Sequence, residues 1–313
     1  DKLVKNSLER VLSLKHNEIK FKLSTPNAVC HWRSKTLATK EPETIKWIDN
    51  FKNTQVVYHL AALADIVPSI QNPKKYFDSN VVGTENIASA IIKHKVKKVI
   101  YSASSSCYGV PKNYPTLETE NIEPQYPYAL TKNLGEQILM HYAKIYSFKV
   151  ASIRLFNVYG TRSRTSGTYG AMFGVFLAQK LKNKPLTVVG DGKQKRDFTY
   201  ISDVIQALYK VIKIKKNFQI FNLGTGNPIA VNDIVKLLGC RSVNIPKRPG
   251  EPDLTSANIT KIKKELNWKP KISIKQGIKN LLNEINYWND APVWTPKKIK
   301  VATKDWFKYL GKK

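Results

Sequence analysis

Two short stretches of the chain carry side chains that can do acid–base chemistry. The first, SASSSCYG, begins at Ser102, and the second, YPYALTK, contains Tyr128 and Lys132 at a spacing of four residues. Side chains at that spacing lie on one face of a helix. An ammonium beside a phenol favours the phenolate and lowers the pKa of a tyrosine from about 10. The pair therefore predicts a general base, and a serine hydroxyl at the end of a preceding strand can orient the same substrate oxygen.

Either stretch alone also has an ordinary structural interpretation, as a polar loop or as part of an amphipathic helix. The order favours the chemical interpretation, because a strand, a serine and then the tyrosine–lysine pair follow one another along the chain. Tyr128 is the tyrosine that fits, since Tyr126 has Leu130 four residues later.

The elements that must position these residues are predicted from apolar spacing. Strands are predicted over 18–23, 54–63, 97–104 and 149–156, and helices over 3–14, 80–94 and 127–146. Strands that alternate with helices indicate parallel pairing, right-handed crossovers and hence a doubly wound α/β sheet. Ligands bind such sheets at the carboxyl ends of the strands. We expect the serine run and Tyr128 at that edge, because the first follows a strand and the second begins the next helix.

The residues after 160 predict a smaller second domain that is discontinuous, because a strand near 217–226 returns to the main sheet. We expect a Rossmann-like cofactor domain over 1–159 with 199–226, a substrate domain over 160–198 with 227–285, and a tail over 286–313. The tail contains Trp288, Trp294, Trp306 and Phe307. We predict that it docks these aromatic side chains on the rest of the chain; a partner-binding helix is the alternative.

Charge is the most unusual feature of the composition. The 313 residues contain 52 Lys and Arg against 23 Asp and Glu, a formal net charge of +29. The lysines are spread along the whole chain without a nucleic-acid-binding motif, so a solvated surface is favoured over nucleic acid as a partner. Five of the eight arginines lie in stretches of interest, where a planar guanidinium suits phosphate: Arg154, Arg162, Arg164, Arg196 and Arg248.

Cysteine and apolar spacing exclude other classes of protein. Cys30, Cys107 and Cys240 are too few and too scattered for a disulfide framework or a metal site, which favours a reducing cytoplasm. The best candidate for a membrane segment is interrupted by Asp65, well short of the roughly 18 apolar residues that a span needs. We expect neither a membrane nor a metal as a partner.

Eight motifs in one order extend the argument: HLAAL, NVVGT, SASSSCYG, YPYALTK, RLFNVYG, GDGKQKRDFTYISDV, FNLGTG and RPGEPD. With them the chain resembles the extended short-chain dehydrogenase/reductases from about residue 54 to residue 285. It is most similar to the NAD-dependent nucleotide-sugar epimerases of the UDP-glucose and UDP-N-acetylglucosamine 4-epimerase type.

The resemblance implies a role for each matching residue. Ser104 aligns with the catalytic hydroxyl, Tyr128 with the base and Lys132 with the lysine that holds the nicotinamide ribose. The implied NAD-binding residues are Ala61, Ala62, Leu63, Asn80 and Ser102, together with Tyr128 and Lys132. The implied UDP-sugar residues are Ser104, Ser105, Ser106, Asn157, Arg196, Arg248, Glu251 and Thr255. The resemblance also implies a homodimer through the helices within 71–94 and 127–146, and epimerisation at C4 through a 4-keto sugar.

Two groups of relatives catalyse other reactions. The 4,6-dehydratases have an Asp-Glu pair directly after the catalytic hydroxyl, and the UDP-glucuronate decarboxylases have a glutamate two residues after it. Ser105 and Ser106 occupy those positions here. Without a carboxylate for the second proton transfer, epimerisation is favoured. A non-catalytic basic relative with impaired NAD binding stays open as another class.

The chain departs from the family at its beginning. Rossmann folds place a glycine-rich loop after the first strand, yet the first glycine here is Gly83. The predicted helix over 3–14 resembles the helix that follows this loop. We therefore expect the first strand and the loop to lie upstream of Asp1 and NAD binding to be weaker without them. The end of the segment 18–26, EIKFKLSTP, also lacks the acid that usually binds the adenine ribose.

Overall fold

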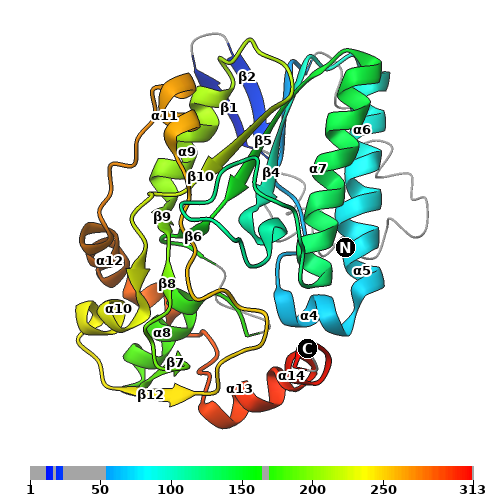
Figure 1. The fold of residues 1–313 in the computed structure, drawn as a ribbon. Helices are drawn as coiled ribbons and strands as arrows, with labels where there is room; N and C mark the ends of the chain where they lie inside the picture. The colour runs from blue at the N-terminus through cyan, green and yellow to red at the C-terminus, as the bar shows by residue number, and fades with distance from the viewer. Residues whose placement is uncertain (1–11, 17–18, 24–53, 164–168, 312–313) are drawn as a thin grey trace, which may run out of the picture. The chain divides into compact units, whose positions relative to one another are not determined.

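The computed structural model describes residues 12–16, 19–23, 54–163 and 169–311 (Figure 1). The chain forms two compact units. The first unit comprises 1–107, 126–154 and 211–221, and the second comprises 108–125, 155–210 and 222–313. These bounds differ from the predicted domains, because four segments predicted for the first domain belong to the second unit: 108–125, 155–159, 199–210 and 222–226. What each unit binds stays a prediction.

Over the described residues, the main sheet has four strands in the order β10-β5-β4-β3. Their bounds are Val56–His59 for β3, Lys98–Ser104 for β4, Lys149–Leu155 for β5 and Gln219–Leu223 for β10. β3 and β4 pair in parallel, with Val56 opposite Lys98 and His59 opposite Tyr101. The predicted parallel, Rossmann-like sheet is therefore confirmed, and β4 ends at the first serine of the predicted site.

Helices of the first unit follow β3 and β4. They are α4 (Ile66–Gln71), α5 (Pro73–Phe77), the π-helical turn η1 (Asp78–Val82), α6 (Gly83–Lys93) and α7 (Pro127–Tyr146). Figure 1 shows α6 and α7 side by side. Between them and the sheet lies a core that includes Ile87, Val99, Tyr101, Leu139 and Val150. This apolar packing fixes α7 against β4.

Residues 12–23 correct one prediction. β1 (Leu12–His16) and β2 (Ile19–Leu23) pair antiparallel as a separate two-stranded sheet. The helix predicted over 3–14 is therefore wrong at its end, and its first residues lie outside the described part. The strand predicted over 18–23 is present, but it is not part of the main sheet. Apolar residues alternate over 12–23, and that period of two favours strands over a helix.

The second unit contains three pairs of short strands and most of the remaining helices. The strand pairs are β6 (Asn157–Tyr159) with β9 (Phe198–Tyr200), β7 (Leu186–Val189) with β12 (Ser242–Ile245), and β8 (Lys195–Arg196) with β11 (Ile229–Ala230). The helices are α8 (Met172–Leu181), α9 (Ile201–Val211), α10 (Val231–Leu238), α11 (Thr260–Leu266), α12 (Ile274–Asn283), α13 (Pro296–Ala302) and α14 (Lys304–Leu310). Their core contains an aromatic cluster, with Tyr159, Phe173 and Phe198 in mutual ring contact.

The C-terminal tail packs within the second unit. Trp288 and Trp306 are buried, and the indole N–H of Trp306 donates to the carbonyl of Pro249 at 2.8 Å. The predicted docking of the tail is confirmed for these two side chains, whereas Phe307 is exposed. Among the described helices, none combines the length and the apolar character needed to cross a bilayer.

Candidate active site

Three hydroxyl groups of the predicted site lie together at the carboxyl end of β4. Ser104 ends the strand, and Ser106 follows in the 3-10 turn η2 (Ser105–Tyr108). The two Oγ atoms are 2.7 Å apart, and the Ser106 amide donates to the Ser104 Oγ at 3.2 Å. The Tyr128 phenol, at the start of α7, also hydrogen-bonds Ser104. The structure thus brings the serine run and the tyrosine together, as the order of the motifs predicts.

The electrostatics of Tyr128 differ from the prediction. Burial raises the pKa of its phenol above the usual value, and the negative charge of Asp65 adds to the rise; the hydrogen bond with Ser104 opposes it. The expectation that Lys132 brings this pKa below its usual value is therefore wrong for the chain by itself, because burial of the phenol raises it. The phenol is therefore protonated at neutral pH.

Lys132 lies one helical turn further along α7 and is buried. Its Nζ lies 4.2 Å from the ring centroid of Tyr101, over the ring face, and the Tyr101 hydroxyl donates to the Lys132 carbonyl at 3.0 Å. A cation over an aromatic face is stabilised by the ring quadrupole. Tyr101 therefore supports Lys132 twice, through its ring and through its hydroxyl. Sequence reasoning missed it, because a tyrosine inside a strand has the pattern of a core residue.

Asn80 and the loop after β3 hold the predicted cofactor residues in place. The Leu63 N–H donates to Asn80 Oδ1 at 2.8 Å, and Asn80 Nδ2 donates to the Leu63 carbonyl at 3.0 Å. Asn80 Nδ2 also donates to Thr131 Oγ1 at 3.0 Å. Ala61 and Ala62 belong to the same loop, which follows the carboxyl end of β3. Asn80 thus links that loop to α7 from a π-helical turn, a feature frequent at functional sites. Thr131 was not among the predicted site residues. Ser102, which was predicted to bind the cofactor, lies within β4.

Arg248 and Arg196, in the second unit, share one carboxylate. Arg248 Nη1 donates to Glu251 Oε1 at 2.8 Å, and Arg196 Nη2 lies 3.8 Å from Glu251 Oε2. The arginine side chains are only 13% and 14% exposed. Burial by itself lowers the pKa of Arg248, but Glu251 and the Tyr169 hydroxyl, to which Nη2 donates, raise it overall. Both guanidinium groups therefore lie beside the carboxylate of Glu251.

Asn157 and Thr255 are the remaining predicted substrate residues. The Thr255 hydroxyl donates to Asn157 Oδ1 at 3.1 Å and accepts from the Asp197 amide at 3.2 Å. The Thr255 amide donates to the Lys195 carbonyl at 3.1 Å, directly before Arg196. The structure therefore brings all five predicted substrate residues beyond the serine run into the second unit, in two neighbouring groups.

Arg154 does not fit the expectation that arginines in the motifs mark phosphate. Its guanidinium is buried against Glu136 of α7, with an Nη2–Oε1 distance of 2.5 Å, and Ser152 donates to the same carboxylate. This pair joins β5 to α7 and is structural. Arg164 lies outside the described residues.

A Rossmann-like sheet with a serine at one strand end and a Tyr-x-x-x-Lys pair on the next helix defines an extended short-chain dehydrogenase/reductase. The chain belongs to the NAD dependent epimerase/dehydratase family, whose model matches residues 2–224. The predicted family is thereby confirmed, and the predicted cofactor, NAD, is the one that the family description names.

Relatives within this family differ in their reactions. The chain is 34% identical to a UDP-glucuronate 4-epimerase of Thermodesulfobacterium geofontis, over 83% of this chain and 80% of the relative. It is 33% identical to UDP-glucuronic acid decarboxylase 2 of Arabidopsis thaliana, over 71% and 52%. A crystal structure of UDP-glucose 4-epimerase from Thermotoga maritima with UDP-glucose matches with a TM-score of 0.75 and 30% identity, over 81% of this chain and 83% of that chain. These three relatives are thus named for UDP-sugars and for more than one reaction.

Proposed function

We propose that the protein epimerises C4 of a UDP-hexose or UDP-N-acetylhexosamine through a 4-keto intermediate, with NAD as cofactor. The observation that carries the proposal is the cluster at the end of β4, where Ser104 hydrogen-bonds Tyr128 and where serines occupy positions 105 and 106. In the dehydratases both of these positions hold carboxylates. In the decarboxylases the second position holds a glutamate. Hydroxyls in place of carboxylates at positions 105 and 106 support the removal and return of one proton on one oxygen.

The residues present suit NAD. Lys132 and Tyr128 offer an ammonium and a hydroxyl on one helix face, which suit the hydroxyl groups of a ribose, and the loop fixed by Asn80 lies after the neighbouring strand β3. We propose that Lys132, Tyr128, Ser102, Asn80 and residues 61–63 hold the cofactor. When bound, NAD accepts hydride from C4 of the sugar and returns it to the other face.

The chain itself supplies orientation and proton transfer. In the proposal, the Ser104 hydroxyl hydrogen-bonds the sugar 4-oxygen, and the Tyr128 oxygen takes the proton from it and later gives one back. Since burial raises the pKa of Tyr128, a base role requires positive charge near the phenol beyond what the chain alone supplies. We assign Lys132, on the same helix face, to the ribose of the cofactor.

The second unit is proposed to hold the nucleotide. Arg196 and Arg248 present two partly buried guanidinium groups beside Glu251. Guanidinium groups pair bidentately with phosphate oxygens, so we assign both arginines to the diphosphate. We assign Asn157 and Thr255 to the same substrate.

The proposal includes assembly and compartment. We propose a homodimer formed by the helices of the first unit, as in the family that the motifs resemble. We also propose a cytoplasmic location, in keeping with Cys107 and Cys240, which are free thiols.

Product analysis tests the reaction. The protein is incubated with NAD and, separately, UDP-glucose, UDP-N-acetylglucosamine or UDP-glucuronate, and the products are identified by NMR. We expect inversion at C4 with every carbon and oxygen retained. A pentose product or loss of water would replace this proposal by decarboxylation or dehydration, and no conversion of any sugar would favour the non-catalytic relative.

A further inference from the structure

The guanidinium of Arg248 lies against two aromatic rings. Its Cζ is 4.9 Å from the ring centroid of Tyr169 and 5.3 Å from that of Trp306. Nη2 also donates to the Tyr169 hydroxyl, and Nη1 to Glu251. An arginine has many rotamers in solution. These contacts leave the Arg248 side chain one orientation.

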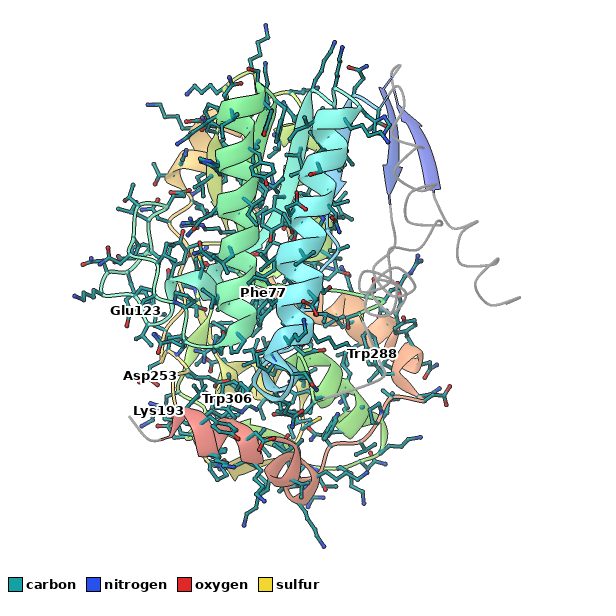
Figure 2. The ribbon with its side chains drawn as sticks, turned by 90° about the vertical axis from the view of Figure 1, so that its right-hand side faces the viewer. Phe77, Glu123, Lys193, Asp253, Trp288 and Trp306 are labelled. Atoms are coloured by element: carbon teal, nitrogen blue, oxygen red, sulfur yellow. The ribbon has the colours of Figure 1, made fainter. Side chains whose placement is uncertain are left out.

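Trp306 contacts the Arg248 loop in two ways. Its ring lies against the guanidinium, and its Nε1 donates to the carbonyl of Pro249, the next residue, at 2.8 Å. Trp306, labelled in Figure 2, is part of α14 and is 2% exposed. The last helix therefore holds both the side chain of Arg248 and the backbone that follows it.

A second tryptophan of the tail supports the other ring. Trp294, just before α13, meets Tyr169 edge-on, with ring centroids 5.3 Å apart and planes at 67°. The Trp294 carbonyl accepts from Gln179 Nε2 of α8 at 2.6 Å. Tyr169 in turn contacts Arg248. Of the two aromatic neighbours of Arg248, Tyr169 thus contacts the segment 294–306 and Trp306 belongs to it.

We propose that the segment 294–306 is a positioning element of the nucleotide-diphosphate site, with Trp306 acting through Arg248. This inference rests on the proposed function, because it takes Arg248 as a phosphate ligand. The segment lies beyond the residues that match the family model, 2–224. A guanidinium held in place before binding loses less conformational freedom when phosphate binds, so the tail raises affinity for the diphosphate.

The test is UDP binding by calorimetry to the whole chain and to single variants. We expect Trp306→Ala to weaken UDP binding about tenfold, the scale of one lost cation–aromatic contact plus one hydrogen bond. Trp306→Phe keeps a ring over Arg248 but loses the indole N–H. Its affinity for UDP therefore falls between that of Trp306→Ala and that of the unaltered chain. Tyr309→Ala is the matched control, since Tyr309 lies on the same helix but is 58% exposed. Its affinity for UDP stays that of the unaltered chain.

A double-mutant cycle separates positioning from a general effect on folding. If Trp306 acts through Arg248, Trp306→Phe has no further effect on UDP affinity in an Arg248→Ala chain. Thermal unfolding identifies any variant that does not fold. If Trp306→Ala does not fold, the inference is tested with Trp306→Phe. Equal UDP binding by Trp306→Phe and the unaltered chain, or losses that add with Arg248→Ala, overturn the inference alone. Failure of the unaltered chain to bind UDP overturns the proposed function as well.

Discussion

At the scale of single residues, Tyr128 is the group on which the proposed chemistry depends. Replacing it by phenylalanine keeps the ring at the start of α7 and removes the oxygen that hydrogen-bonds Ser104. We expect turnover to fall by about 10²–10⁴, the usual loss when a positioned acid–base group is removed. UDP-sugar binding should change little, because the arginines of the second unit are untouched.

Tyr126→Phe is the matched control for this substitution. Tyr126 lies next to α7 and stacks on Tyr128, with ring centroids 6.4 Å apart and planes at 6°. It has no role in the proposed proton transfer, so turnover should be close to that of the unaltered chain. Turnover of Tyr128→Phe equal to that of the control would remove Tyr128 from the mechanism.

Thr255 bears on the choice of sugar. The resemblance places it where family members restrict or admit the substituent at C2, and its hydroxyl bonds Asn157. Threonine is small, so UDP-N-acetylhexosamines should be accepted. Thr255→Tyr should lose N-acetylated substrates selectively, as measured by kcat/KM on both sugar classes, whereas Thr255→Ser should keep both. An equal loss on UDP-glucose argues against control of the C2 substituent.

At the scale of elements, helix α7 carries both Tyr128 and Lys132, and its distance from the sheet is set by a glycine. A Cβ at Gly135 would lie 2.5 Å from the Tyr101 hydroxyl and 3.1 Å from Thr84 Oγ1. The absence of a side chain there lets α7 approach the tyrosine that supports Lys132.

Gly135→Val should therefore destabilise the protein. Overpacking a tight contact costs about 1–3 kcal/mol, and valine recovers little of this in helix propensity. The measurement is the urea midpoint of unfolding, with Gln137→Ala as the control, because Gln137 is exposed on the same helix. A midpoint unchanged by valine would show that α7 can move away without cost.

The strand and helix that carry the active-site residues were more predictable than the side chains that hold those residues in place. Apolar spacing predicts β4 and α7, so the positions of Ser104, Tyr128 and Lys132 follow from local pattern. Tyr101 and Asn80 act through contacts between elements distant in the chain, which no local pattern shows. The sign of the Tyr128 pKa shift depends on burial, which is also a tertiary property. β1 was missed because its residues fit a helical and an alternating pattern at once.

At the scale of the whole molecule, the first unit carries exposed apolar side chains on its helices. Phe77 of α5, labelled in Figure 2, and Ile145 of α7 are 45% and 56% exposed. Apolar side chains on neighbouring helices suit a two-fold interface, where each copy presents the same surface.

We therefore expect a dimer of twice the chain mass of 35.6 kDa by light scattering at micromolar concentration. A chain carrying both Phe77→Glu and Ile145→Glu should be a monomer, because a charge at each position would be buried without a partner. Ile205→Glu is the control, since Ile205 is equally exposed but lies on α9. A monomeric unaltered chain contradicts the expected assembly.

The most direct test of the central claim follows the hydrogen at C4. UDP-glucose labelled with deuterium at C4 is incubated with the protein and NAD, and the product is analysed by NMR and mass spectrometry. Hydride that leaves C4 and returns to the same carbon keeps the label there, in a C4 epimer of unchanged mass. That is the result we predict. A label found on another carbon, or a product that has lost water, would contradict epimerisation at C4.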